Sequence, residues 1–224
     1  MSKFASLRIV IFAAVTIIPV IFLLLGGMLG GLWLVAGFTY MAILVHAMDE
    51  LLPTALRLPA SDQDYPGANG LCILLATFHF ILLFIAVRAV SGANDLAIWE
   101  RCLAFIGFGL LFGQVSNSNA HELIHRSSAG LRALGGWVFT SLLFGHHATA
   151  HPAIHHVFVA SAGDPNTARP GESFYRFAPR AWGGHFTKDS YWKRGNGKPE
   201  PTIGGGTHTS NTSAARWLFW RVFG

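Results

Sequence analysis

Two clusters of histidine are the residues in this sequence best suited to chemistry. Five of the eleven histidines lie in residues 145–156, GHHATAHPAIHH, and two more lie in HELIH, residues 121–125. On an α-helix, side chains four residues apart stand on one face about 5–6 Å from each other. His121 with His125, and His151 with His155, are therefore each spaced to bind one metal ion. Neutral imidazole suits iron, zinc and copper.

The other histidines give a weaker signal. A single histidine in or near a membrane helix is more often a hydrogen-bonding or interfacial residue, and this interpretation applies to His46, His79, His185 and His208. His146 and His147 are also left out of the metal set. Pro152 is expected to start a new helical turn after His151 and so to break the register that would connect His147 to the second cluster.

The elements that must position these histidines are membrane helices. The chain has 52% hydrophobic and 12% charged residues, whereas soluble domains carry about 25% charged residues. Residues 9–48 contain no Asp, Glu, Lys or Arg, and this length suffices for two crossings of a hydrocarbon core of roughly 30 Å. Gly26, Gly27, Gly30 and Gly31 are expected to form the turn between them. The sequence predicts an all-α integral membrane protein with about four transmembrane helices, near residues 9–26, 31–48, 71–91 and 102–120.

The basic residues predict the orientation and the domain organisation. Residues 120–224 hold eleven of the sixteen Lys and Arg residues, and these residues favour the cytoplasmic side of a membrane. After a membrane region at 1–120, we expect a cytoplasmic histidine-box region at 121–194, with the amino terminus on the same side of the cell (inner) membrane. Residues 195–224 form a flexible connector with an aromatic-basic end. No run of five basic residues occurs, so the expected partner is the membrane and not nucleic acid.

HELIH on its own matches the zinc protease motif, in which two histidines bind zinc and the glutamate is the general base. Glu122 would then activate a water molecule for attack on a peptide bond. An intramembrane zinc metalloprotease is therefore one alternative. It leaves the second histidine cluster without a role.

Residues 117–180 resemble the membrane alkane monooxygenases of the histidine-box desaturase and hydroxylase group. The resemblance rests on NAHELIHR at 119–126, on HPAIHHVFVASAGDP at 151–165, which contains an HxxxHH box, and on ARPGESFYRFAPR at 168–180. Desaturases share the histidine boxes. The DP pair followed by ARPGESFYRF is typical of the alkane hydroxylase branch.

This resemblance implies a ligand set and an activity. The implied metal ligands are His121, His125, His151, His155 and His156. Two non-heme iron ions would activate O₂ with electrons from a rubredoxin-type donor. One oxygen atom would be inserted at the terminal methyl of a medium- or long-chain alkane or a related fatty-acyl-like lipid. A methyl C–H bond offers no acidic proton, so the reactivity has to come from the metal centre.

Carboxylates are expected near such a centre, because neutral imidazoles leave the charge of the iron uncompensated. Glu122 and Asp164 are the candidates for this catalytic role. The competing interpretations are an exposed helix residue for Glu122 and an Asp-Pro turn for Asp164. Glu172 has the same ambiguity.

The sequence also departs from the family. Members are usually longer, with two further spans and a third box of the type HxxHH, and nothing after His156 matches that box. Two irons need about eight protein ligands, and the matched boxes supply five. We therefore expect a truncated member or a fragment, whose site is complete only if His46, His79, His185, His208 or another chain of an oligomer supplies the missing ligands. A non-catalytic remnant is the remaining alternative.

Overall fold

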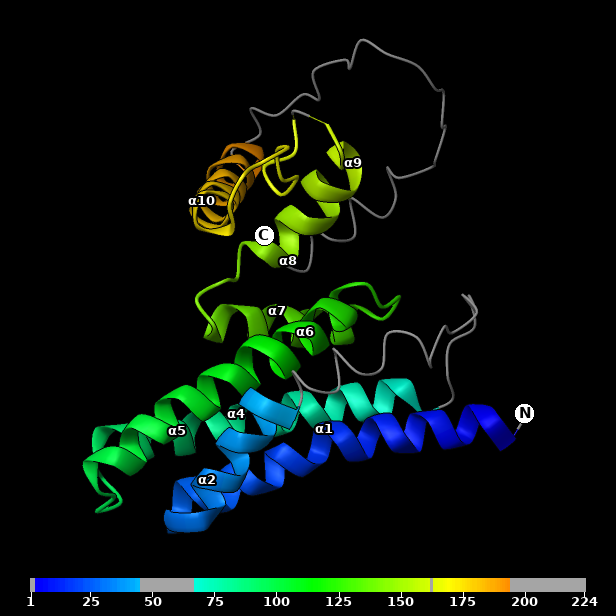
Figure 1. The fold of residues 1–224 in the computed structure, drawn as a ribbon. Helices are drawn as coiled ribbons and strands as arrows, with labels where there is room; N and C mark the ends of the chain where they lie inside the picture. The colour runs from blue at the N-terminus through cyan, green and yellow to red at the C-terminus, as the bar shows by residue number, and fades with distance from the viewer. Residues whose placement is uncertain (1–2, 45–66, 162, 194–224) are drawn as a thin grey trace. The chain divides into compact units, whose positions relative to one another are not determined.

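The computed structural model describes residues 3–44, 67–161 and 163–193 (Figure 1). All regular structure within these ranges is helical, which confirms the all-α prediction. The chain divides into two compact units, Met1–His125 and Arg126–Gly224. His46, His208 and the predicted connector at 195–224 lie outside the described residues.

The first unit is built from long apolar helices. Its elements are α1 (Lys3–Leu29), α2 (Gly31–Thr39) with the π-helical turn η1 (Tyr40–Leu44), α4 (Ala68–Ser91), α5 (Ile98–Leu111), the π-helical turn η2 (Phe112–Ser116), and α6 (Asn117–Ile124). α5, η2 and α6 follow one another without a break, so the first histidine box lies at the end of one continuous helical segment.

Among the described residues, three helical segments are long and apolar enough to cross a membrane, namely Val10–Leu29, Ala68–Ser91 and Ile98–Ile124. They correspond to the first, third and fourth predicted spans. Gly31–Ile43 is apolar but shorter. Residues 45–48 of the predicted second span lie outside the described residues, so that crossing stays a prediction.

Small residues let the helices of the first unit approach closely, as is common in membrane bundles. A Cβ atom on Gly26 would lie 2.8 Å from the backbone nitrogen of Leu34, which brings α1 and α2 into backbone contact. The turn itself is made at Gly30 and Gly31, which have φ values of 68° and 58°. Gly26 and Gly27 thus belong to α1 and not to the turn. The core comprises Val20, Leu23, Leu34, Met41, Leu82, Ala86, Ala89, Ala104, Phe108 and Leu111.

The second unit carries the second histidine box on short helices. Its elements are α7 (Ala129–Ser141), α8 (His147–Ala150), the π-helical turn η3 (His151–His155), α9 (His156–Phe158) and α10 (Phe174–Lys193). α10 packs against α8 and η3. Its buried face presents Ala181, His185 and Asp189 at intervals of four residues. The Thr149 hydroxyl donates a hydrogen bond to the Asp189 carboxylate over 2.5 Å and so joins α8 to α10.

Candidate metal centre

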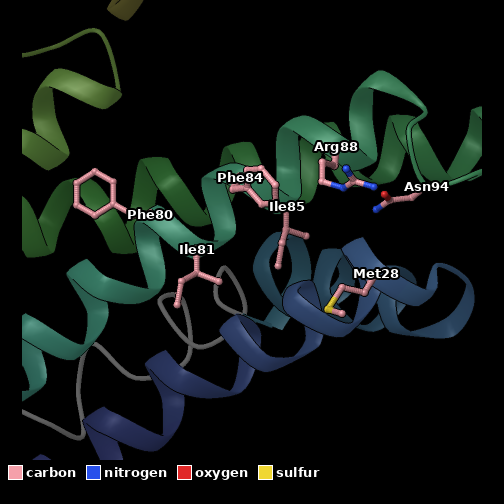
Figure 2. A pocket seen from close by; sticks show the side chains of 7 residues that line it. All are labelled: Met28, Phe80, Ile81, Phe84, Ile85, Arg88 and Asn94. Atoms are coloured by element: carbon pink, nitrogen blue, oxygen red, sulfur yellow. The ribbon is translucent and has the colours of Figure 1, made fainter.

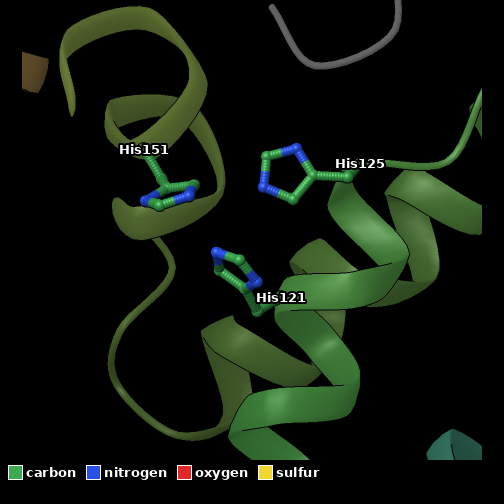
Figure 3. A group of neighbouring side chains, drawn as sticks. All are labelled: His121, His125 and His151. Carbon is green, nitrogen blue, oxygen red and sulfur yellow. The ribbon is translucent and has the colours of Figure 1, made fainter. Parts of the chain in front are cut away.

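The first histidine box occupies the end of α6. The rings of His121 and His125 have centroids 4.8 Å apart and approach edge to face, as the spacing of four residues predicts (Figure 3). Leu123 and Ile124 between them are buried and hold the helix in place. Glu122 is exposed. Because their rings are adjacent, the imidazoles of His121 and His125 can bind one metal ion together.

A buried amide anchors this helix. Nδ2 of Asn119 donates a 3.0 Å hydrogen bond to the carbonyl of Cys72 near the start of α4. Both residues are buried. Asn119 precedes His121 by two residues, so the contact fixes the part of α6 from which the histidines project.

Replacing Asn119 by alanine is expected to destabilise the first unit by about 1 kcal/mol, the usual size of an interhelical hydrogen bond in a membrane protein. Thermal unfolding in detergent would measure the change. Ser118→Ala is the matched control, because Ser118 is exposed on the same helix. Equal melting temperatures for the two variants would contradict a structural role for the amide.

The second box lies on a π-helical turn, where the sequence predicts a regular α-helix. The backbone N–H of His156 bonds to the carbonyl of His151, five residues back. His151 and His155 are stacked with ring centroids 5.0 Å apart, and Nε2 of His156 lies 3.0 Å from Nε2 of His151. In an α-helix, residues five apart point about 140° away from each other. The wider turn brings all three imidazoles together, and such turns are frequent at functional sites.

His147 also belongs to this group of rings. It is buried, and its ring centroid lies 4.8 Å from that of His151. From the sequence, His147 is not expected in the metal set, because Pro152 is predicted to break the register. Instead, the helical path continues from α8 into η3. Pro152 cannot donate a backbone hydrogen bond, and the chain accommodates this residue within the wider turn.

Asp164 holds one histidine of the box in a defined orientation. Its buried carboxylate accepts hydrogen bonds from Nδ1 of His155 at 2.8 Å, the backbone N–H of Asn166 at 2.9 Å and the hydroxyl of Thr167 at 2.5 Å. Burial raises the pKa of Asp164, but these hydrogen bonds more than offset it, so the pKa lies below its usual value. Because a carboxylate only accepts, the proton of His155 is on Nδ1, and Nε2 keeps a lone pair for a metal.

His185 reaches the same region from α10. It is 2% exposed, with Nε2 at 3.8 Å from Oδ1 of Asp164 and its ring 5.9 Å from that of His147. Burial lowers the pKa of His185, and the nearby Asp164 charge only partly reverses this. A neutral imidazole is the form that binds metals. In the sequence, His185 stands 29 residues after His156 and is one of four histidines that could complete the site, and its place on the buried face of α10 distinguishes it from the others.

An ion pair fixes the loop that carries Asp164. The Arg180 guanidinium binds both oxygens of Glu172, at 2.7 and 2.6 Å. It also donates to the carbonyls of Pro165 at 2.9 Å and Thr167 at 3.1 Å. The hydrogen bond from Arg180 lowers the pKa of Glu172 to about 2. The ion pair between Arg180 and Glu172 therefore contributes its full stabilisation of the folded protein above pH 4.5, and this contribution is lost as the pH falls toward 2. Glu172 thus pairs with an arginine, and none of these hydrogen bonds connects it to a histidine.

Arg180→Lys is expected to weaken iron retention roughly tenfold, the lower end of what mutations around metal ligands cost. A lysine can pair with Glu172 but cannot bind both carbonyls beside Asp164 at the same time. Competition with a chelator would measure iron retention. Arg176→Lys, on an exposed position of the same helix, serves as the control. Unchanged retention in Arg180→Lys would show that the loop needs no such support.

Comparisons with known proteins place both boxes in one family. The model of the fatty acid desaturase family matches residues 96–223. Over 151 residues, the chain is 30% identical to alkane 1-monooxygenase 1 of Alcanivorax borkumensis, which covers 65% of this chain and 37% of that protein. Over 85 residues, it is 36% identical to alkane 1-monooxygenase 1 of Pseudomonas aeruginosa, which covers 38% of this chain and 22% of that protein.

A similar match, 28% identical over 154 residues, is found with alkane 1-monooxygenase 2 of Alcanivorax borkumensis. It covers 66% of this chain and 40% of that protein, so the matched part spans at most about two fifths of the length of these relatives. The desaturase model covers more than half of the chain, and the curated relatives agree on the branch. The chain therefore belongs to the fatty acid desaturase family, in its alkane monooxygenase branch.

Proposed function

We propose that this chain is a membrane diiron monooxygenase that hydroxylates the terminal methyl of medium- or long-chain alkanes. The observation that carries the proposal is the group of imidazoles around η3, in which Asp164 orients His155. The family match supports it, because residues 96–223 include both histidine boxes. The proposed ligands are His121, His125, His151, His155 and His156.

The donor set fits iron. Imidazole nitrogen binds iron well, and a histidine that donates its other N–H to a carboxylate is a more basic ligand. Asp164 supplies that carboxylate and also a buried negative charge beside His155 and His185. We propose Asp164 as the residue that orients a ligand and balances charge. His147 and His185 are further imidazoles that the second unit offers to the same metals.

A bound iron pair would supply the activation of O₂, which no acid–base side chain of this chain can provide. The chain contributes ligation and access for an apolar substrate. Three helices in the described part of the chain are long and apolar enough to span a bilayer, in which alkanes dissolve, so the substrate would enter from the membrane. We further propose a location in the inner membrane with the boxes on the cytoplasmic side, where a rubredoxin-type protein would deliver electrons.

Metal analysis with an activity assay tests the proposal. The full chain, purified in detergent from cells grown with iron and zinc, is expected to retain iron in preference to zinc. With a rubredoxin, its reductase and NADH supplied, it should convert octane to 1-octanol. One zinc per chain, or octane left unchanged by iron-loaded protein, would contradict the proposal.

Glu122 separates this proposal from the zinc metalloprotease alternative, which the family match does not favour. In a protease, Glu122→Gln would keep the metal and abolish peptide cleavage, because the glutamate is the general base. In the diiron enzyme, Glu122 balances charge near His121, so the change should lower iron retention, with no effect on proteolysis. Purified Glu122→Gln protein that keeps its metal and loses a measurable peptidase activity would favour the protease.

A further inference from the structure

A groove runs along one face of α4 in the first unit, beside α1 (Figure 2). Its volume is about 680 Å³. Five apolar side chains and two polar ones line it: Met28, Phe80, Ile81, Phe84, Ile85, Arg88 and Asn94. None of these residues belongs to either histidine box.

The length of the groove along α4 is close to the hydrocarbon thickness of one leaflet of a bilayer. Its lining residues on α4 recur at intervals that place them on one face of the helix, from Phe80 to Arg88. Eight residues of α-helix rise about 12 Å. One leaflet contributes roughly 15 Å of hydrocarbon to a core of about 30 Å. The groove can therefore hold most of an extended acyl chain that lies parallel to α4.

Hydrogen bonds fix the polar end of the groove. Nδ2 of Asn94 donates to the carbonyl of Gly27 on α1 at 2.7 Å. The Glu100 carboxylate accepts from the backbone N–H of Gly31 at 2.6 Å and from that of Ala97 at 2.8 Å. The end of α1, the start of α2 and the loop before α5 are thus joined, so this wall is formed before any ligand binds.

Arg88 places a positive charge at this end. It is exposed and lies three residues before the end of α4. Its guanidinium donates to the Ala93 carbonyl at 3.5 Å and lies over the Phe84 ring at 6.0 Å, and both of these partners are uncharged. Among the described residues, Arg88 forms no ion pair. The Glu100 carboxylate uses its two oxygens on backbone N–H groups.

We propose that this groove binds an anionic phospholipid, with one acyl chain along α4 and the phosphate at Arg88. A guanidinium fits phosphate with two parallel hydrogen bonds, and these are strong where water is scarce. An alkane would use the apolar wall but would leave the guanidinium without an anion. The groove is therefore a lipid site, distinct from the path of the proposed substrate.

The experiment measures the lipid that the full chain retains. Protein purified in detergent is incubated with phosphatidylglycerol or with phosphatidylcholine, whose phosphate is balanced by its own ammonium group, and bound lipid is counted by native mass spectrometry. Wild-type protein is expected to bind one phosphatidylglycerol in preference to phosphatidylcholine by roughly tenfold, the ratio that one charge-assisted hydrogen bond supplies. Arg88→Gln should abolish that preference, and Arg88→Lys should retain most of it.

A second pair of variants tests the apolar wall. Ile81→Trp fills the groove and should lower lipid occupancy, whereas Val87→Trp is the control because Val87 is exposed on the same helix outside the lining. Helix content by circular dichroism verifies that each variant is folded. Equal phosphatidylglycerol binding by wild type and Arg88→Gln would overturn the proposal. So would a wild-type chain that binds no lipid.

Discussion

His155→Ala is expected to reduce the iron retained by the purified chain by about 10- to 100-fold or more. Mutating a residue that only hydrogen-bonds to a metal ligand already costs about 10- to 100-fold in metal affinity. A buried carboxylate fixes the orientation of His155, over 2.8 Å to Asp164. Its removal takes away a proposed ligand and leaves the Asp164 carboxylate without that donor. Iron per chain, measured by mass spectrometry after removal of free metal, gives the result.

His146→Ala is the matched control for this experiment. His146 lies in the same segment, but its ring packs edge to face against Trp182 at 5.4 Å and Phe186 at 5.6 Å. It should therefore lose some packing and keep its iron. His121→Ala is the corresponding change in the first box and should also lower iron content. Equal iron in His155→Ala and His146→Ala would refute the assignment of the second box.

The long helices could be predicted from the sequence because their signal is continuous. Uncharged runs of about twenty residues have few alternatives to a spanning helix, and three of the four predicted spans coincide with described helices. The glycines were also informative, although only Gly30 and Gly31 make the turn. The first box follows the same logic, because a spacing of four residues on a regular helix leaves His121 and His125 adjacent.

The second unit could be predicted only in part. Hydrophobic periodicity assumes 3.6 residues per turn, and nothing in HPAIHH distinguishes that period from the wider turn of η3. Because Pro152 favours the start of a new turn, the sequence also does not predict that His147 joins this group. His185 is one of several histidines that could complete the site, and the sequence does not single it out, because its contact with Asp164 depends on the fold of the intervening loop. Such long-range contacts have no local signal in a single sequence.

Asp164 is a candidate in the sequence because a metal held by neutral imidazoles favours a nearby carboxylate, and the structure supplies the contact that a test can address. Asp164→Asn is expected to weaken iron binding by about 10- to 100-fold, as mutation of a carboxylate behind a histidine ligand typically does. The amide keeps the shape of the side chain. It loses the negative charge that makes His155 a stronger base, and it has one oxygen in place of two.

Three donors compete for that single oxygen, namely Nδ1 of His155, the N–H of Asn166 and the hydroxyl of Thr167. The amide nitrogen would face at least one of them as a second donor, so the orientation of His155 should loosen. Iron affinity is measured by competition with a chelator. Asp189→Asn is the control, because Asp189 is also buried and its negative charge also raises the pKa of His185. If both variants lose the same affinity, the effect is one of buried charge alone. A selective loss in Asp164→Asn is the result that the hydrogen bond to His155 predicts.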